Sequence, residues 1–238
     1  MRIKDIIVEE PVVPSIKQTK FQRGTPNDER ARINKIAGKS YRKFNPVSGI
    51  DFLGKGVQAY AVSKKDKPHE VKKIVFEGGH PTKDPYFKFL KIAIKNQDSI
   101  FMPKVYSIKI FKYAKGPSDS VLHSYSYHVE MERLVGYTAL NWGQWSHLFR
   151  TYLGTPINKI DDIDSKAAAA TYFAEILNDL INVGSHPREV KISNELMPVL
   201  KKLARIKNVY HDLHLENMMY RITPYGVQPV IADPFYYS

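Results

Sequence analysis

The residues best suited to chemistry lie near the C-terminus, where two aspartates and an asparagine follow a characteristic spacing. Asp212 opens the segment Asp-Leu-His-Leu-Glu-Asn, which ends at Asn217, and Asp233 follows the hydrophobic run Val-Ile-Ala. An Asp-x4-Asn loop followed by a strand that ends in Asp is typical of phosphotransferases. The first carboxylate can orient or deprotonate an attacking hydroxyl, while the amide and the second carboxylate offer oxygens to magnesium. We therefore assign Asp212 as a candidate catalytic base and Asn217 and Asp233 as candidate metal ligands.

Each of these residues also has a purely structural interpretation. Asp and Asn favour loops, and Asp233 stands before Pro234, where it could simply end a strand. His211 and His214 could be mistaken for a metal-binding pair, but the sequence offers no evident third ligand. We favour the chemical interpretation because the features occur together and in order.

A glycine-containing segment upstream could contribute the loop that covers a nucleotide's phosphates. Gly54-Lys-Gly-Val-Gln-Ala-Tyr-Ala partly follows the pattern G-x-G-x-x-G-x-V, with Ala59 and Ala61 in place of the third glycine and the valine. Gly54 and Gly56 would allow the backbone to approach phosphate closely. Alone, this pattern does not distinguish a nucleotide-binding loop from an ordinary hairpin turn.

Two adjacent lysines in the next predicted strand compete for contact with the phosphates. Strand alternation places Val71, Lys73 and Val75 on one face, and Glu70 and Lys72 on the other. The residue two before the phosphate-binding lysine should be small and apolar, to lie against adenine. Val71 meets this requirement and Glu70 does not, so we predict that Lys73 is the phosphate-binding lysine.

The elements that must position these residues fall into two halves, and their order predicts an α+β fold. Asp84 and Pro85 are suited to start a helix at 84–96, and Ser165 is suited to cap a long helix at 165–183. The first half has predicted strands at 50–58, 59–63, 70–76, 104–113 and 122–134, with the helix at 84–96 among them. The second half has predicted helices at 142–152, at 165–183 and up to about residue 206, then strands at 218–222 and 228–232.

We expect three parts along the chain. Residues 1–48 are a basic, extended N-terminal arm with one short helix near 27–38. Residues 49–134 carry the nucleotide loop, the strand lysine and a helix, and residues 135–238 carry the catalytic loop.

The composition restricts the function classes. The chain has no cysteine, which excludes disulfides, thiolate metal sites and a cysteine nucleophile. No apolar run reaches the roughly 18 residues that a membrane span needs, so we expect no membrane partner. The formal net charge of +12 favours polyanions such as nucleotides, nucleic acid or an acidic protein face. We expect the basic arm to make any nucleic-acid contact.

These motifs resemble those of the protein-kinase-like superfamily, and most closely the early serine/threonine kinases of T-seven-type bacteriophages. The similarity covers about residues 51–235. It rests on Phe52-Leu-Gly-Lys-Gly, the strand around Lys73, Met102-Pro-Lys-Val-Tyr, Asp212-Leu-His-Leu-Glu-Asn-Met-Met and Ile231-Ala-Asp-Pro. The resemblance implies a two-lobed fold: a five-stranded antiparallel N-lobe sheet (49–134) with one helix, and a truncated, mainly helical C-lobe (135–238).

The resemblance also implies an activity, the transfer of the γ-phosphoryl group of ATP to serine or threonine hydroxyls of host proteins in the host bacterial cytoplasm. It implies that Asp212 is the catalytic base, that Asn217 and Asp233 bind Mg2+, and that Lys73 holds the α- and β-phosphates. Gly54 and Gly56 would cover the phosphates. Val71 and the hinge at 132–137, with Glu132 and Leu134, would lie at the adenine.

A second resemblance concerns the first ten residues. They are similar to the capsid-targeting peptides of internal head proteins in T-four-like phages, which are cut after a hydrophobic-x-Glu sequence. Ile7-Val-Glu fits that pattern. This resemblance implies packaging in a phage virion and cleavage after Glu9.

Departures from the kinase pattern leave two other functions open. The predicted helix at 84–96 has no glutamate to pair with Lys73, and Asp233 is followed by Pro-Phe rather than Phe-Gly. The chain also ends five residues after Asp233, without the segments that dock peptide substrates. One alternative is a small-molecule kinase of the aminoglycoside or choline kinase type. The sequence Asp212-x-His-x-x-Asn resembles the motif of those kinases. The other is a catalytically inactive kinase-like virion or binding protein.

Overall fold

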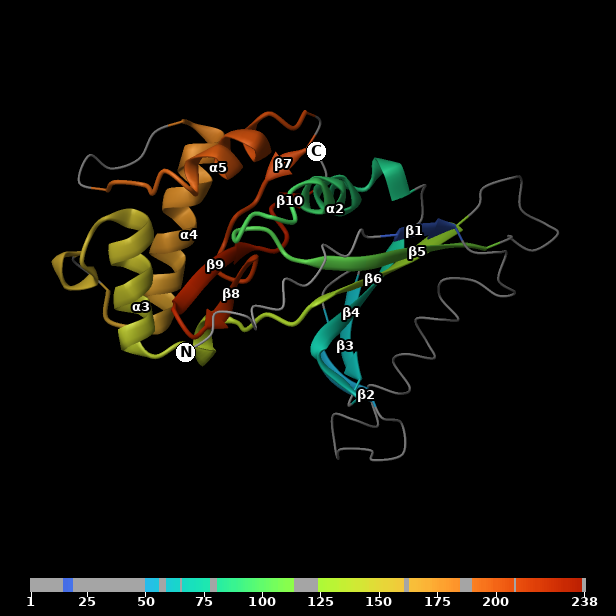
Figure 1. Cartoon of the computed structure of the whole chain (residues 1–238). Helices are drawn as coiled ribbons and strands as arrows, with labels where there is room; N and C mark the ends of the chain where they lie inside the picture. The colour runs from blue at the N-terminus through green and yellow to red at the C-terminus, as the bar shows by residue number, and fades with distance from the viewer. Residues whose placement is uncertain are drawn as a thin grey trace, which may run out of the picture. The chain divides into compact units, whose positions relative to one another are not determined.

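The structure is a computed structural model that describes residues 15–18, 50–55, 59–64, 66–77, 81–113, 124–160, 163–184, 190–207 and 209–236 (Figure 1). Its contacts divide the chain into two compact units. The first comprises Met1–Pro81 and Val105–Glu132, and the second comprises Thr82–Lys104 and Arg133–Ser238. Most of the predicted basic arm, including its helix near 27–38, lies outside the described residues.

The first unit is built on one sheet with the strand order β1-β5-β6-β4-β3-β2. All neighbours in it are antiparallel except β1 and β5, which are parallel. The bounds are β1 Ser15–Gln18, β2 Ile50–Lys55, β3 Ala59–Lys64, β4 Lys67–Glu77, β5 Val105–Tyr113 and β6 Ser124–Glu132. The five strands predicted between residues 50 and 134 are all present, whereas β1 was not predicted as a strand.

The second unit combines helices with two short antiparallel strand pairs. Its helices are α2 Pro85–Lys95, α3 Trp142–Leu148, α4 Lys166–Asn182 and α5 Met197–Ala204. Strand β7 (Tyr210–His211) pairs with β10 (Phe235–Tyr236), and β8 (Met218–Thr223) pairs with β9 (Gly226–Ile231). Short 3-10 turns lie at Pro81–Lys83, Tyr137–Ala139 and Ile157–Lys159, and a π-helical turn at Phe149–Leu153 follows α3. The predicted α+β class is confirmed.

Helix α2 belongs to the second unit, which differs from the predicted division of the chain. The sequence grouped this helix with the strands of residues 49–134, but the contacts group it with the C-terminal strands. Phe89 is fully buried, and its ring packs edge-to-face against Phe235 of β10 with 6.1 Å between ring centroids. Burial of the Phe89 ring against Phe235 stabilises the packing of α2 on the C-terminal strands. The sequence did not predict this packing, because local patterns carry no information about a partner so far along the chain.

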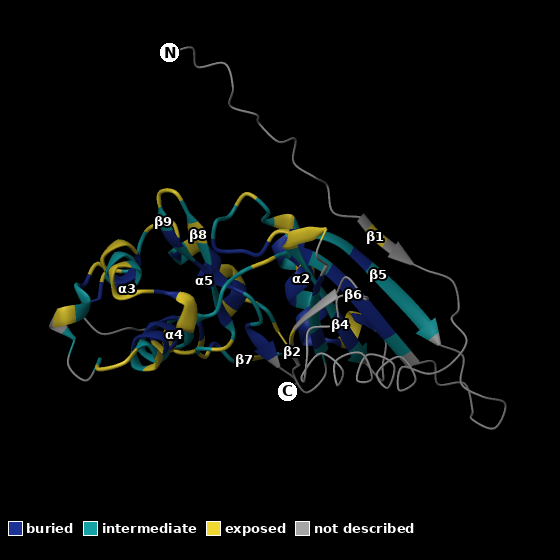
Figure 2. Ribbon diagram, turned by 90° about the horizontal axis from the view of Figure 1, so that it is seen from below, coloured by how far each residue is buried: buried dark blue, intermediate teal, exposed yellow. Residues whose placement is uncertain are grey.

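Aromatic residues form the centre of the second unit. Trp145 of α3 packs against Tyr220 of β8 with 5.3 Å between ring centroids, and Phe149 packs against Phe173 of α4 at 5.8 Å. All four side chains are fully buried. Figure 2 shows buried positions on α3 and α4 alternating with exposed ones, as expected for amphipathic helices. In the described part of the chain, no helix combines the length and hydrophobicity needed to cross a membrane.

The start of α2 allows a direct test of its predicted cap. Asp84 is 4% exposed, and its Oδ1 accepts a 2.9 Å hydrogen bond from the backbone N–H of Tyr86. We expect Asp84→Ala to lower the free energy of unfolding by about 0.5–2 kcal/mol, because a helix N–H loses its acceptor. Denaturant unfolding measures the change. Asp84→Asn keeps an acceptor oxygen and should lose much less, so equal losses in both variants would contradict a capping role.

Candidate active site

The loop from Asp212 to Asn217 is held in a closed turn between β7 and β8. The backbone N–H groups of Asn217 and Met218 both donate to the carbonyl oxygen of His214, at 2.9 and 3.2 Å. The side chain of Asn217 spans the loop, because its Nδ2 donates a 2.7 Å hydrogen bond to the carbonyl oxygen of Asp212. This bond uses the amide nitrogen, so a cation at Asn217 would bind the Oδ1 atom.

Asp233 lies next to both ends of this loop. The N–H of Asp212 donates to the carbonyl oxygen of Pro234 at 2.9 Å, and the N–H of Ala232 donates to the carbonyl oxygen of Asn217 at 3.0 Å. The residues on either side of Asp233 are therefore tied to Asp212 and to Asn217. The structure thus brings together, within one unit, the three residues that the sequence singled out.

Contacts with α4, α5 and β10 of the same unit hold the loop in place. The N–H of Leu213, a buried residue inside the loop, donates to Oδ1 of Asn178 on α4 at 3.1 Å. The ring of His211 lies 3.0 Å from the carbonyl oxygen of Leu203 on α5 and packs edge-to-face against Phe235. His211 therefore ties the start of the loop to α5 and β10.

His214 is a residue of the site to which the sequence interpretation gave no role. Its Nε2 lies 3.7 Å from Oδ2 of Asp212, and the two side chains are 45% and 46% exposed. The N–H of Glu216 donates to its Nδ1 at 3.2 Å, so the neutral ring carries its hydrogen on Nε2, toward Asp212. The two-residue spacing in Asp212-x-His214 is the signal that could have indicated this pairing.

The donor set suits magnesium in type. The structure holds two aspartates and one asparagine near each other, and magnesium takes a few protein oxygens and completes its octahedron with phosphate and water. Among the described residues, no group of three or more His, Cys, Asp or Glu side chains is arranged to hold a metal ion. A magnesium ion here would therefore depend on Asn217 and on ligands from outside the protein.

The stretch predicted as a hinge is anchored beside this loop. The N–H of Val135 donates to the carbonyl oxygen of Tyr220, and the N–H of Tyr220 donates back to Val135, both at 2.9 Å. Tyr220 lies on β8, the strand that starts directly after Asn217. Leu134, half-buried and adjacent to Val135, therefore belongs to the same unit as the loop from Asp212 to Asn217, whereas Glu132 ends β6 in the first unit.

The strand register in the first unit separates Lys72 from Lys73. On β4, Lys73 pairs with Ala61 on β3 and with the fully buried Val129 on β6. Lys72 pairs instead with Val62 and with Glu130. Because directly paired residues share a face of the sheet, Lys73 lies on the same face as Val129, and Lys72 lies on the face of Glu130.

Glu130 gives Lys72 an electrostatic partner on that other face. Ser107 Oγ donates a 2.6 Å hydrogen bond to Glu130, and Lys109 lies 3.6 Å from its carboxylate. The hydrogen bond from Ser107, together with the positive charges of Lys109 and Lys72, lowers the pKa of Glu130. Lys72 therefore contributes to a group of charges that is separate from the face of Lys73.

The remaining predicted nucleotide-binding residues are described in part. Gly54 lies in β2 opposite Ala61, next to an irregularity in register between Phe52 and Gly54. Val71 pairs with the buried Met131 on β6. Gly56 lies outside the described residues. Lys73, Gly54 and Val71 belong to the first unit, and Asp212, Asn217 and Asp233 to the second.

Comparisons with known proteins assign no family. No protein-family description matches the chain, and no curated protein matches it.

Proposed function

We propose that this chain is an ATP-dependent phosphotransferase with a two-lobed, protein-kinase-like fold, and that it phosphorylates serine or threonine hydroxyls of host proteins in the bacterial cytoplasm. One observation carries the proposal: backbone hydrogen bonds from Asp212 to Pro234 and from Ala232 to Asn217 place Asp233 between the two ends of the Asp-x4-Asn loop. A loop that merely turned the chain would not require an acid, an amide and a second acid at this junction.

Each residue then has a separate task. Asp212 accepts the proton of the attacking hydroxyl and orients its oxygen. Asn217, through Oδ1, and Asp233, through its carboxylate, hold Mg2+, which neutralises charge on the phosphates when ATP is bound. Lys73 neutralises charge on the α- and β-phosphates, with Gly54 and Gly56 over the phosphates and Val71, Glu132 and Leu134 toward the adenine.

The order of elements supports the kinase-like assignment. A lysine in the third of five antiparallel strands precedes a helix, two further strands, helices and the catalytic loop. In the kinase pattern, a glutamate of this helix pairs with the strand lysine. Helix α2 contains no acidic residue and cannot supply that partner for Lys73. This difference favours a catalytically inactive binding protein. Label transfer from ATP distinguishes such a protein from an enzyme.

One observation favours a small-molecule acceptor as the second candidate function. Nε2 of His214 lies 3.7 Å from Oδ2 of Asp212, so the histidine and the aspartate of the Asp-x-His-x-x-Asn motif are close together. This motif resembles that of aminoglycoside and choline kinases. Such an acceptor would not need a surface that docks a protein. The chemistry at Asp212, Asn217 and Asp233 is the same in both proposals.

Label transfer from ATP tests the function and its acceptor. The purified chain is incubated with magnesium and γ-labelled ATP, together with bacterial lysate that has been separated into protein and small-molecule fractions. Labelled proteins that disappear with Asp212→Asn support the protein kinase. Label only in the small-molecule fraction supports the second candidate, and no transfer to either fraction overturns the enzymatic proposal.

The two adjacent lysines should respond differently to the same substitution. Lys73→Met should weaken nucleotide binding or turnover by on the order of 1.5–3 kcal/mol, because a charge-assisted contact to phosphate is lost. Lys72→Met, the matched control, should leave both nearly unchanged, because Lys72 lies on the face of Glu130. ATP titration and turnover measure both effects. Damage from Lys72→Met alone would show that the phosphates lie on the opposite face of the sheet.

A further inference from the structure

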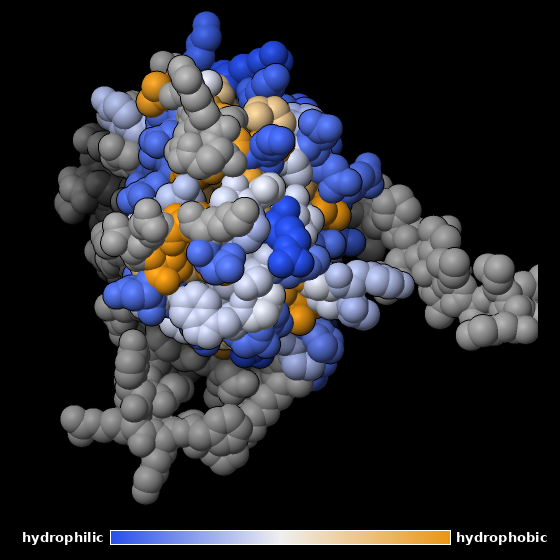
Figure 3. All heavy atoms as spheres, turned by 90° about the vertical axis from the view of Figure 1, so that its left-hand side faces the viewer, coloured by the Kyte–Doolittle hydropathy of each residue, from blue (hydrophilic) through white to orange (hydrophobic). Residues whose placement is uncertain are grey.

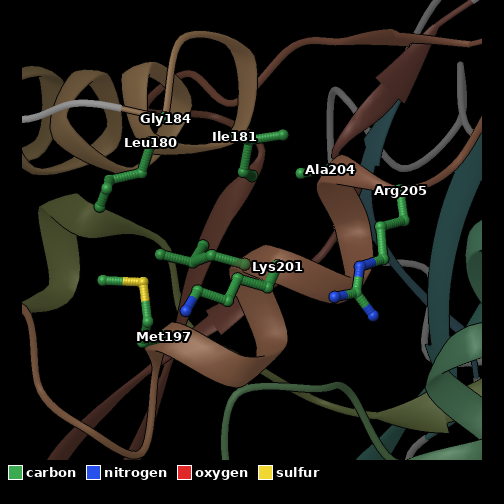
Figure 4. Close-up of a pocket in the computed structure, with 8 residues that line it drawn as sticks. Leu180, Ile181, Gly184, Met197, Lys201, Ala204 and Arg205 are labelled. Carbon is green, nitrogen blue, oxygen red and sulfur yellow. The ribbon is translucent and has the colours of Figure 1, made fainter.

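A separate open pocket lies between α4 and α5 in the second unit. It has a volume of about 610 Å³. Figure 4 shows its lining, whose residues come mainly from the end of α4 and from α5. The residues are Leu180, Ile181, Gly184, Met197, Leu200, Lys201, Ala204 and Arg205. None of them belongs to the candidate active site.

The lining combines apolar walls with two positive charges. Leu180, Ile181, Met197 and Leu200 supply the apolar surface, of which Ile181 and Leu200 are buried and the other two half-buried. Lys201 on α5 and Arg205, the residue directly after α5, are both exposed and stand four residues apart. No carboxylate is among the described residues that line the pocket.

The basic character continues beyond the pocket. Lys202, the neighbour of Lys201, donates a hydrogen bond to the side chain of Asn96, directly after α2. Helix α2 carries Lys88, Lys91 and Lys95 and no acidic residue, and α5 has no acidic residue either. Lys201 and Arg205 would attract a negatively charged partner to the pocket, in keeping with the formal net charge of +12.

We infer that the α4–α5 pocket docks an acidic, amphipathic peptide segment of a partner protein. Apolar side chains of the segment fill the space between Leu180 and Met197, and its carboxylates pair with Lys201 and Arg205. A flexible methionine in the wall suits an apolar anchor of variable shape. This inference does not depend on phosphoryl transfer and would hold for an inactive protein too.

The lining favours a peptide over nucleic acid. Single-stranded nucleic acid needs aromatic side chains on which its bases stack, and no described residue of the lining is aromatic. A duplex would use the lysines but leave the apolar walls uncovered. On the face of the molecule that Figure 3 shows, hydrophobic side chains form small separate patches among hydrophilic ones, which gives no broad apolar surface there. In the α4–α5 pocket, apolar surface and positive charge lie together.

Fluorescence anisotropy at physiological salt tests the inference with a defined probe. The probe is a fluorescein-labelled helical peptide with leucine at positions i, i+3, i+4 and i+7 and glutamate between them. Two control peptides replace leucine by serine or glutamate by lysine, and a short DNA duplex is the polyanion control. We expect saturable binding of the leucine–glutamate peptide and at least about tenfold weaker binding of all three controls.

Variants locate the binding. Lys201→Glu combined with Arg205→Glu removes the charges, and Ala204→Trp fills the pocket while keeping them; each should weaken binding about tenfold or more. Arg150→Glu, at an exposed arginine of the same unit outside the pocket, should leave binding unchanged. All substituted positions are exposed, and thermal unfolding of each variant checks the fold. Absence of saturable binding, equal binding of the serine peptide or the duplex, or an unaffected Ala204→Trp variant would each overturn the inference.

Discussion

Replacing Asp212 by asparagine should reduce phosphoryl transfer by about 10²–10⁴-fold, because the attacking hydroxyl loses its proton acceptor. The substitution should spare the fold. The two hydrogen bonds that fix Asp212 in the loop use its backbone: its N–H donates to Pro234, and its carbonyl oxygen accepts from Asn217. An asparagine at this position can keep both bonds. Turnover and the thermal unfolding midpoint are measured on the same preparation.

A neighbouring carboxylate provides the matched control for this substitution. Glu216 lies in the same loop and is exposed, so Glu216→Gln also removes one negative charge near the site. Turnover of Glu216→Gln should stay close to that of the unsubstituted chain. If Asp212→Asn folds normally and turns over as fast as this control, Asp212 is not the catalytic base.

The second large effect is expected at Asp233. Asp233→Ala should remove the magnesium-dependent part of ATP binding, because a charged oxygen contributes more to a divalent ion than a neutral one does. Asn217→Ala should weaken this binding less. It should also lower the free energy of unfolding by about 0.5–1.5 kcal/mol, because the hydrogen bond across the loop is lost.

Calorimetric titration of ATP with and without magnesium measures both effects. Asp98, an exposed acid of the same unit, supplies the control Asp98→Ala, which should bind ATP as the unsubstituted chain does. Equal magnesium dependence in Asp233→Ala and in the control would exclude Asp233 as a metal ligand.

The elements predicted best were those specified by local signals. Asp84 and Pro85 mark the start of α2, and Ser165 accepts a hydrogen bond from Ala168 at the start of α4. The conformation of the loop from Asp212 to Asn217 is also determined locally, because the N–H of Asn217 donates to the carbonyl oxygen of His214 within the same loop. In each case the residues that determine the structure lie within a few positions of one another.

Features that depend on distant partners were not predictable in the same way. Strand β1 is recognisable only through its parallel pairing with β5, and two-residue strands such as β7 and β10 exist only because they pair with each other. The contacts group helix α2 with the C-terminal strands, and this grouping depends on a contact between Phe89 and Phe235, which are far apart in the sequence. Periodicity shows which face of a helix is apolar but not what covers it.

The candidate site shows the same division. The residue types and their order indicated Asp212, Asn217 and Asp233, but the hydrogen bonds that bring Asp233 to the loop pass through the backbones of Ala232 and Pro234. The α4–α5 pocket had no sequence signal, because Leu180 and Lys201 meet only when the two helices pack. Its charges appeared in the sequence only as part of a general basic excess.

A crystal structure of the chain with Mg2+ and a non-hydrolysable ATP analogue would show directly whether Asn217 and Asp233 bind the metal. We expect a magnesium ion at about 2.0–2.1 Å from Oδ1 of Asn217 and from a carboxylate oxygen of Asp233, with phosphate oxygens and water completing its octahedron. The Asp212 carboxylate should face the γ-phosphate. Nucleotide and metal bound elsewhere, with neither Asn217 nor Asp233 among the ligands, would exclude the proposed magnesium and ATP site.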